Sequence, residues 1–357
     1  MDISEEPMPG YERVVWGRDV QSGYRGVVVV HSTTLGPAVG GTRYWHYRSE
    51  SEALTDALRL ARGMTYKNAL AGLPCGGGKS IIFRSEGREK EGVDREKLFR
   101  AHGKLVEYLG GNYITGEDVG TGPADMEYVF EETQHVAGLK GRSGDPSPHT
   151  ARGVFRAIEA AAHYRWGSDD LSGKTVAIQG CGHVGYHLAK ELRQAGTRLI
   201  VTDIDRERVE RVVQDFAASR AAPDRIHAAE CEIFAPCALG GILNDQTIPE
   251  LRAQLVVGGA NNQLLEPRHG DLLERRGILY APDYAANAGG VIHGCSIEIL
   301  GWDPARAERH LDEGIYKTLL RIFKLARKRG IPTSRAADRL AEERLASPAP
   351  SARFESG

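Results

Sequence analysis

The 357-residue sequence lacks the charge excess, the long apolar runs and the cysteine pairs that mark several classes of protein. Its formal net charge is −2, so it has no basic footprint for nucleic acid. The apolar run 27–30 is too short to cross a membrane, and the acidic start, MDISEEPMPG, lacks the basic and apolar regions of a signal peptide. The five cysteines form no CxxC pair and the histidines show no metal spacing, so we expect reduced thiols in a cytoplasmic protein that holds no metal.

The length and composition predict a soluble globular protein of about two domains. A segment rich in Gly, Pro and Ser, GRSGDPSPH at 141–149, marks the boundary. From Lys174 onward short apolar strands alternate with helices, which predicts a parallel, doubly wound α/β sheet. The candidate strands of this second domain are residues 175–179, 198–203, 232–235, 255–258 and 277–281.

The first part of the chain predicts a smaller set of elements. We expect a strand at 26–31, a loop at 36–43, a helix that Ser51 caps and that carries Lys67, and a second helix at 97–109. The residues that follow predict a charged surface segment at 84–96, a short strand and turn at 113–121, a helix at 151–164 capped by Thr150, a loop at 283–290, helices at 304–329 and 334–346, and a frayed end.

Two lysines stand twelve positions apart, Lys67 near the end of a predicted helix and Lys79 after the glycine run 76–78. Glycines let a backbone turn sharply and approach a ligand, so we expect the run to fold back and bring both ammonium groups to one site. A phosphate-binding P-loop would need Gly six places before the lysine, where Leu73 stands, and it would follow a strand instead of a helix.

The pair of lysines gains a third member in Asp118, which lies in the predicted turn after residue 113. One ammonium group can hold an anionic substrate in a charge-assisted pair. The other can act as a base if its pKa falls from about 10.4 to about 7–8, and burial and a like charge both push it that way. Asp118 can orient the base or exchange a proton, although an aspartate in a turn is also common for structural reasons.

The motif GCGHVG at 180–185 stands between a predicted strand and a predicted helix, the full context of a dinucleotide-binding loop. Its first glycine allows the turn, its second lets a pyrophosphate reach the backbone, and its third permits close packing. Asp203, 23 residues after Gly180, can accept hydrogen bonds from ribose hydroxyls and would repel a 2′-phosphate, which favours NAD over NADP. Arg206 nearby tempers that preference.

A third motif, GGANNQ at 258–263, follows another strand of the same sheet. Loops at the carboxyl ends of parallel strands line the ligand crevice, so Asn261 and Asn262 are candidates to bind a carboxamide and a carboxylate. A polar turn without a ligand is the alternative.

Taken together, these stretches resemble the glutamate, leucine, phenylalanine and valine dehydrogenase family, and most closely its leucine, phenylalanine and valine branch. The likeness covers nearly the whole chain. It is carried by LGPAVGGTR, RGMTYKNALAGLPCGGGKSII, YITGEDVGT, VAIQGCGHVG, FAPCALGG, GANNQL, GILYAPDYAANAGGVI and AADRLAEER. It implies a substrate-binding and catalytic domain at 1–145, a Rossmann-type NAD domain at 146–330, and a C-terminal segment at 331–357 that returns to the first domain, with the active site in the cleft.

The resemblance also implies roles for single residues. Lys67 would hold the substrate carboxylate with the help of Asn262, Lys79 would be the catalytic base, and Asp118 would assist proton transfer. The implied reaction is reversible oxidative deamination of an L-amino acid to a 2-oxo acid and ammonia by a homo-oligomeric enzyme. The cofactor-binding residues would be Thr150, Gly180, Cys181, Gly182, His183, Val184, Gly185, Asp203, Cys237, Ala238 and Asn261.

The expected substrate is apolar. Glutamate enzymes of the family carry a lysine where this chain has Val39, and the pocket would be lined by Val39, Gly116, Val291 and Gly294. The leucine-type pattern has Ala and Val in place of Gly116 and Gly294, so we expect a larger cavity. We therefore favour phenylalanine or tryptophan over leucine or valine, although the phenylalanine enzymes have a bulky residue at the Gly294 position.

Two other functions are alternatives. A catalytically silent NAD-binding regulator would be expected to have lost one of Lys67, Lys79 and Asp118. A 2-hydroxy acid dehydrogenase would need a His–carboxylate pair as its base, and the sequence offers none at a suitable place.

Overall fold

The computed structural model describes residues 1–84 and 94–347 and divides into two compact units. Unit 1 comprises residues 1–144, 294–302 and the chain from 342 onward, and unit 2 comprises residues 145–293 and 303–341. Most of the charged segment predicted at 84–96 and the predicted frayed end lie outside the described residues. The division of the chain into a substrate-binding and a cofactor-binding domain stays a prediction.

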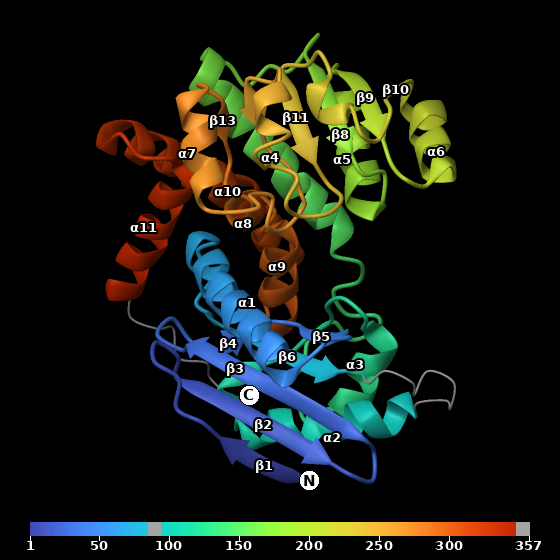
Figure 1. Ribbon diagram of the computed structural model, residues 1–357, viewed down its shortest axis with the longest axis vertical. Coiled ribbons are helices and arrows are strands. Elements are labelled where there is room, and N and C mark those ends of the chain that lie inside the picture. Colours follow the sequence, from blue (N-terminus) through green and yellow to red (C-terminus); the bar gives the residue numbers. More distant parts are fainter. Residues whose placement is uncertain (85–93, 348–357) are drawn as a thin grey trace. The chain divides into compact units, whose positions relative to one another are not determined.

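Unit 1 contains a mixed sheet in the order β1-β2-β3-β6-β4-β7, with β5 also paired to β6 (Figure 1). Strands β1, β2, β3 and β6 are antiparallel neighbours, whereas β4 and β5 lie parallel to β6. The bounds are β1 Asp2–Glu5, β2 Arg13–Asp19, β3 Tyr24–Ser32, β4 Ala38–Val39, β5 Thr42–Trp45, β6 Gly76–Phe83 and β7 Tyr113–Ile114.

Helices cover both faces of this sheet, and the valine run of β3 explains why. Successive strand residues point to opposite faces of the sheet. Val27 and Val29 therefore form one core with α1 (Glu50–Leu70), and Val28 and Val30 belong to a second core on the other face. The alanines of α1 at positions 53, 57 and 61 repeat every fourth residue and meet the first face. Helix α2 (Arg95–Tyr108) and helix α3 (Pro123–Phe130) contribute to the second core. The run 27–30 is therefore apolar because both faces of β3 are buried.

The glycine run was predicted to form a sharp turn, and this prediction is wrong. Residues 76–78 are the first residues of the buried strand β6, and none of them has a positive φ. The turn is made earlier by Gly72, whose φ is +76°. A Cβ atom on Gly77 would lie 2.0 Å from the backbone nitrogen of Thr65, so the glycines are needed because α1 packs directly against β6.

Several local predictions also need correction. Ser49, not Ser51, caps α1, since its side chain accepts a hydrogen bond from the Glu52 amide. The predicted loop at 36–43 contains β4 and the start of β5 because these residues complete the parallel part of the sheet. Thr150 lies within the first turn of α4 (Ser147–Trp166) instead of capping it. The predicted loop at 283–290 begins with α8 (Asp283–Ala286) and leads into α9 (Gly289–Gly294).

Unit 2 is built on a fully parallel six-stranded sheet in the order β10-β9-β8-β11-β12-β13 (Figure 1). The chain moves outward from β8 in one direction and then starts again beside β8 with β11, which is the order of a dinucleotide-binding sheet. The bounds are β8 Thr175–Gln179, β9 Arg198–Thr202, β10 Ser219–Arg220, β11 Ile233–Pro236, β12 Leu255–Val256 and β13 Leu279–Tyr280. The predicted doubly wound α/β fold is confirmed.

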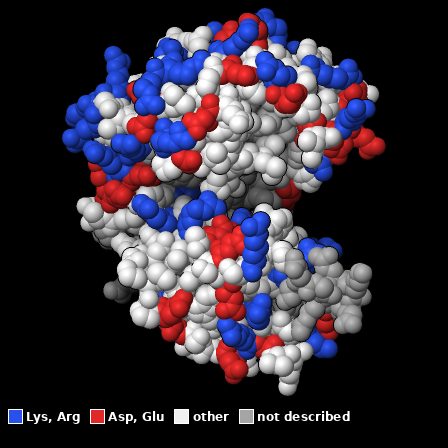
Figure 2. Space-filling view, viewed as in Figure 1, with Lys and Arg blue, Asp and Glu red and all other residues white. Residues whose placement is uncertain are grey.

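The helices of unit 2 flank this sheet, and α4 packs against both α5 and α10. Further helices of this unit are α5 His183–Gln194, α6 Arg206–Phe216, α7 Arg268–Arg275 and α10 Pro304–Arg329. Helix α11 (Thr333–Ala346) begins in unit 2 and ends in unit 1, and the π-helical turn η4 at Cys295–Ile299 belongs to unit 1. Figure 2 shows both signs of charge over the visible face of unit 2. Its ion pairs include Arg268 with Asp245 and Arg335 with Asp271. Among residues 1–84 and 94–347, no helix combines the length and the hydropathy that a bilayer crossing needs.

Candidate active site

Lys79 and Asp118 meet in unit 1, as the sequence predicted. Lys79 lies on β6 and is only 4% exposed, and its Nζ is 3.0 Å from Oδ2 of Asp118. Asp118 lies in the turn after β7, and the Thr121 hydroxyl closes this turn by accepting from the Asp118 amide at 2.8 Å and donating to the Thr42 carbonyl at 3.0 Å. The turn therefore presents the carboxylate to a buried ammonium group.

Burial and neighbouring charges shift the pKa values of this pair in a defined way. Burial lowers the pKa of the Lys79 ammonium group from its ordinary value, and the Asp118 carboxylate opposes that shift. Burial alone would raise the pKa of Asp118, but the charges of Lys79 and Arg43 lower it to about 2. The carboxylate therefore stays ionised at neutral pH. The surroundings of Lys79 make its ammonium group easier to deprotonate.

Arg43 is a member of this cluster that the sequence reasoning missed. Its Nε lies 2.9 Å from Oδ2 of Asp118, and its Nη1 lies 2.9 Å from Oδ2 of Asp56 on α1. The run GPAVGGTR that ends at Arg43 was predicted as a loop and noted as a family stretch, and no role was given to Arg43. In the structure Arg43 is half-buried between Thr42 and Tyr44, both buried on β5, and the sequence carried no signal for this strand.

Lys67 lies in the last turn of α1 and is half-buried. The α1–β6 contact at Thr65 and Gly77 lies two residues before Lys67 on the helix and two residues before Lys79 on the strand. The two lysines therefore stand on neighbouring elements of unit 1 that pack directly against each other. Their joint action on one substrate stays a prediction.

A buried polar network lies beside Lys79 and was not predicted. The His102 ring bonds through Nδ1 to the Tyr24 hydroxyl at 2.8 Å and through Nε2 to the Thr42 hydroxyl at 2.8 Å. The Thr42 hydroxyl also lies 2.7 Å from the hydroxyl of Ser80, the residue after Lys79. Burial lowers the pKa of His102 to about 3, so the ring is neutral. This uncharged network therefore holds β6 in place next to Lys79.

Three of the four predicted pocket residues belong to unit 1. Val39 is buried on β4, Gly116 follows β7, and Gly294 precedes the π-helical turn, whereas Val291 lies on α9 within unit 2. A Cβ atom on Gly116 would lie 3.4 Å from the Ala137 carbonyl oxygen, and one on Gly294 would meet nothing within 4 Å. Packing therefore requires glycine at neither position, and Gly294 has open space beside its backbone.

The glycine loop in unit 2 has the geometry of a nucleotide cradle. Gly180 has a φ of +100°, which favours glycine, and a Cβ atom on Gly185 would lie 1.9 Å from the Gly180 carbonyl oxygen. Gly182 caps α5, so the positive end of that helix faces the loop. A Cβ atom on Gly182 would meet only the Arg208 guanidinium group, at 3.8 Å, so the backbone there is open to a ligand.

Asp203 follows directly after β9, and both of its carboxylate oxygens are held in place. Oδ2 accepts from the Cys181 amide at 2.7 Å, and Oδ1 accepts from the Asp205 amide at 3.0 Å. Each oxygen keeps a second lone pair that can accept from a ribose hydroxyl. The glycine loop and this oriented carboxylate fit a nicotinamide dinucleotide.

The other predicted cofactor residues lie on loops of the same unit. Cys237 and Ala238 follow β11, and their backbone atoms would lie 2.9 Å from a Cβ atom on Gly180, which brings the β8 and β11 loops together. Asn261 accepts a hydrogen bond from Asn287, a residue that the sequence reasoning did not assign, at 2.7 Å. Three further placements complete the predicted set. His183 and Val184 are the first residues of α5, and Thr150 lies in the first turn of α4. Asn262, the residue after Asn261, has a φ of +54°.

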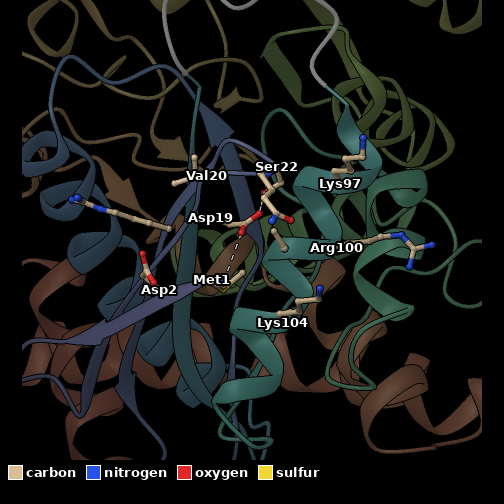
Figure 3. A pocket seen from close by; sticks show the side chains of 11 residues that line it. Met1, Asp2, Asp19, Val20, Ser22, Lys97, Arg100 and Lys104 are labelled. Carbon is tan, nitrogen blue, oxygen red and sulfur yellow. Dashed lines mark hydrogen bonds and ion pairs between the residues drawn. The ribbon is translucent and has the colours of Figure 1, made fainter.

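A separate cavity of about 750 Å³ lies in unit 1 near the N-terminus (Figure 3). Lys97, Arg100 and Lys104 project from α2 on one side, and Asp19 forms an ion pair with the N-terminal amino group. Lys97 and Arg100 are themselves paired with Asp94 and Glu96. No predicted site residue lines this cavity, so we assign no chemistry to it.

The comparisons with known proteins agree with this geometry. Residues 13–135 match the Glu/Leu/Phe/Val dehydrogenase dimerisation domain, and residues 141–207 and 200–350 match the glutamate/leucine/phenylalanine/valine dehydrogenase domain. The chain is 52% identical to leucine dehydrogenase of Geobacillus stearothermophilus over 338 residues, which cover 94% of this chain and 90% of that protein. It is 46% identical to valine dehydrogenase of Streptomyces coelicolor over 347 residues, which cover 96% and 94%.

A solved structure supports the same assignment. L-tryptophan dehydrogenase from Nostoc punctiforme superposes with a TM-score of 0.83 at 42% identity, covering 94% of this chain and 96% of that one. The matched domains, the identities and the superposition agree, and the chain belongs to the glutamate, leucine, phenylalanine and valine dehydrogenase family, whose members are oxidoreductases that act on the CH–NH2 group of amino acids and use a nicotinamide cofactor.

Proposed function

We propose that this amino acid dehydrogenase uses NAD to deaminate an apolar L-amino acid reversibly, and that large or aromatic side chains are preferred. The observation that carries the catalytic part is the buried Lys79–Asp118 pair, with 3.0 Å between Nζ and Oδ2. Burial lowers the pKa of the Lys79 ammonium group, which makes its proton easier to remove, as a general base requires. The choice of NAD rests on Asp203, whose oriented carboxylate would repel a 2′-phosphate.

When bound, NAD would supply the acceptor for a hydride from the Cα of a substrate whose amino group is neutral, and an iminium group would remain on the substrate. Lys67 pairs with the α-carboxylate, and Asn262 donates a further hydrogen bond to it. Lys79 removes a proton from a water molecule as that water attacks the iminium carbon. The Asp118 carboxylate then relays that proton from the Lys79 ammonium group to the amino group of the carbinolamine. As the C–N bond breaks and ammonia leaves, the carbinolamine hydroxyl gives its proton to Lys79 and becomes the carbonyl of the 2-oxo acid. In the reverse direction the same groups take the opposite roles.

The preference for a large side chain rests on Gly116 and Gly294, two positions where a Cβ atom would fit and glycine leaves it out. Leucine is the second candidate substrate, because the leucine dehydrogenases of Geobacillus stearothermophilus and Thermoactinomyces intermedius are both 52% identical to this chain. A methylene group in an apolar pocket changes selectivity by only about 1–3 kcal/mol, so several amino acids can be turned over.

The substrate panel is the direct test. We expect NADH oxidation with 2-oxo acids only when ammonium is present, and a higher kcat/KM for phenylalanine and tryptophan than for leucine and valine. The double variant Gly116→Ala, Gly294→Val should lower the aromatic-to-leucine ratio of kcat/KM by about 10- to 200-fold. Gly314→Ala, where a Cβ atom meets nothing within 4 Å, is the matched control. Turnover without ammonium would contradict the deamination, and an aliphatic preference of the wild type would contradict the enlarged pocket.

Residues 13–135 match a dimerisation domain, which supports the proposal that this enzyme is a homo-oligomer. Light scattering coupled to gel filtration should give a mass of at least twice the chain's 38.9 kDa.

A further inference from the structure

We propose that Arg43 is a positioning residue for the base: it holds the Asp118 carboxylate against Lys79 and is itself held by Asp56. This inference rests on the proposed role of Lys79 and adds a residue to the proposed machinery. It assigns a function to the end of the GPAVGGTR run, for which the sequence supplied none.

The geometry makes Arg43 a bridge between two carboxylates on different elements. Its Nε donates to Asp118 in the turn after β7, and its Nη1 donates to Asp56 on α1, both at 2.9 Å. The guanidinium group is planar and rigid, so two donors engaged on two partners fix its orientation. The Asp118 oxygen that Arg43 contacts, Oδ2, is the one that lies 3.0 Å from Nζ of Lys79. A movement of Arg43 would therefore displace the carboxylate oxygen that contacts the Lys79 ammonium group.

The far end of the bridge is anchored as well. The Tyr47 hydroxyl donates to Oδ2 of Asp56 at 2.7 Å, and Arg59 contacts Oδ1 of Asp56 at 2.8 Å. The Asp56 side chain is 18% exposed and that of Arg43 is 21% exposed, so solvent screens their contact only in part. Arg59 is 54% exposed, and its charge is largely screened. The tightly held chain is thus Tyr47–Asp56–Arg43–Asp118–Lys79.

The charges along this chain act on Lys79 with alternating sign. Burial lowers the pKa of Lys79, Asp118 raises it, Arg43 lowers it, and Asp56 raises it. A guanidinium group does not lose its proton in a protein, so the Arg43 charge is constant across the working pH range. Tyr113, also near Asp118, is neutral there because burial raises its pKa to about 12. Helix α1 further carries Lys67, whose charge is the same in every variant below.

These signs lead to opposite predictions for two neighbouring substitutions. Arg43→Gln removes a positive charge beside Lys79, so the acid limb of the kcat/KM profile against pH should move up by about one unit. Asp56→Asn removes a negative charge but can still accept the Tyr47 hydrogen bond, so the same limb should move down. Arg43→Lys keeps the charge but loses the double contact, so the limb should stay near its wild-type position while kcat falls. A purely structural role for Arg43 would lower activity without moving the limb in opposite directions.

A second measurement follows Lys79 without catalysis. Competitive labelling of the full-length protein with acetic anhydride from pH 6 to 11, read by mass spectrometry of the peptide that contains Lys79, gives the proton affinity of this side chain in each variant. We expect the labelling midpoint to rise in Arg43→Gln and to fall in Asp56→Asn. If wild-type protein lacks ammonium-dependent activity, the proposed function fails, yet the labelling still decides the role of Arg43. Midpoints that stay unchanged, or that move the same way in both variants, would overturn the inference.

Discussion

The close packing of α1 on β6 allows a sharp prediction for Gly77→Ala. The new Cβ atom would lie 2.0 Å from the Thr65 nitrogen and 2.4 Å from its Cα, both backbone atoms of α1. Ordinary non-bonded separations are about 3.5–4.0 Å, so helix and strand must separate by more than about 1 Å. Overpacking of this kind costs about 1–3 kcal/mol, and we expect the upper end because no side chain can rotate away.

Function should suffer as well as stability, because α1 carries Lys67 and β6 carries Lys79. A displacement of about 1 Å between catalytic groups can lower the rate by about 100-fold. In thermal denaturation, a loss of about 3 kcal/mol should lower Tm by roughly 6–12 °C for a domain of this size. Both readings come from one variant: Tm by calorimetry or fluorescence, and kcat by NADH formation.

Gly63→Ala is the matched control on the same helix. A Cβ atom on Gly63 meets nothing within 4 Å, and alanine is the better helix former by about 0.5–1 kcal/mol. We expect this variant to have a slightly higher Tm and unchanged kcat. A Gly77→Ala protein with the Tm and kcat of the wild type would refute the claim that these glycines serve the α1–β6 contact.

Four further outcomes follow from the same structure. Lys79→Gln removes the proposed base, so kcat should fall by about 10²- to 10⁴-fold while the Kd for NADH, from fluorescence titration, stays the same; a small loss of kcat would exclude Lys79 as the base. Asp203→Ala removes the oriented acceptor, so the Kd for NADH should rise about tenfold or more and discrimination against NADPH should weaken. The pKa of Asp118 is about 2 in the folded state and 3.8 ordinarily, so its carboxylate stabilises the protein by roughly 2 kcal/mol above about pH 4. This stabilisation is lost as the pH falls from about 4 to 2, and the urea denaturation of Asp118→Asn should lack that pH dependence. The pKa of His102 is about 3 when folded and 6.5 ordinarily, so protonation favours the unfolded chain and stability should fall by up to about 1.4 kcal/mol per unit as the pH drops from 6.5 towards 3; His102→Gln should flatten this slope.

Much of unit 2 could be predicted because its signals are local. The motif at 180–185 combines a strand, a turn that requires glycine and a helix start within a few residues, and Asp203 follows at the end of the next strand. Alternating apolar strands and helices leave few topologies other than a parallel, doubly wound sheet. The helix that carries Lys67 was likewise predictable from the spacing of its apolar residues.

The short elements of unit 1 could not be predicted in the same way. Strands β4, β5 and β7 have only two to four residues each, and each is a strand because it pairs with a neighbour already in the sheet. The glycine run illustrates the same limit, since the sequence gives no sign that a helix backbone lies 2.0 Å from a Cβ atom on Gly77. A run of three glycines fits both a turn and a tightly packed strand, and only the contact distinguishes them.

The amino-acid sequence by itself determined which chemical groups this dehydrogenase possesses: two lysines, an aspartate and a dinucleotide loop, each recognisable from residue type and spacing. The tertiary structure alone decided how those groups influence one another. Arg43 and Asp118 are 75 residues apart in the chain, and Tyr24 and His102 are 78 apart, yet each pair is in hydrogen-bonding contact. Charge and burial act through distance in space, so the protonation of Lys79 is set by the folded arrangement around it.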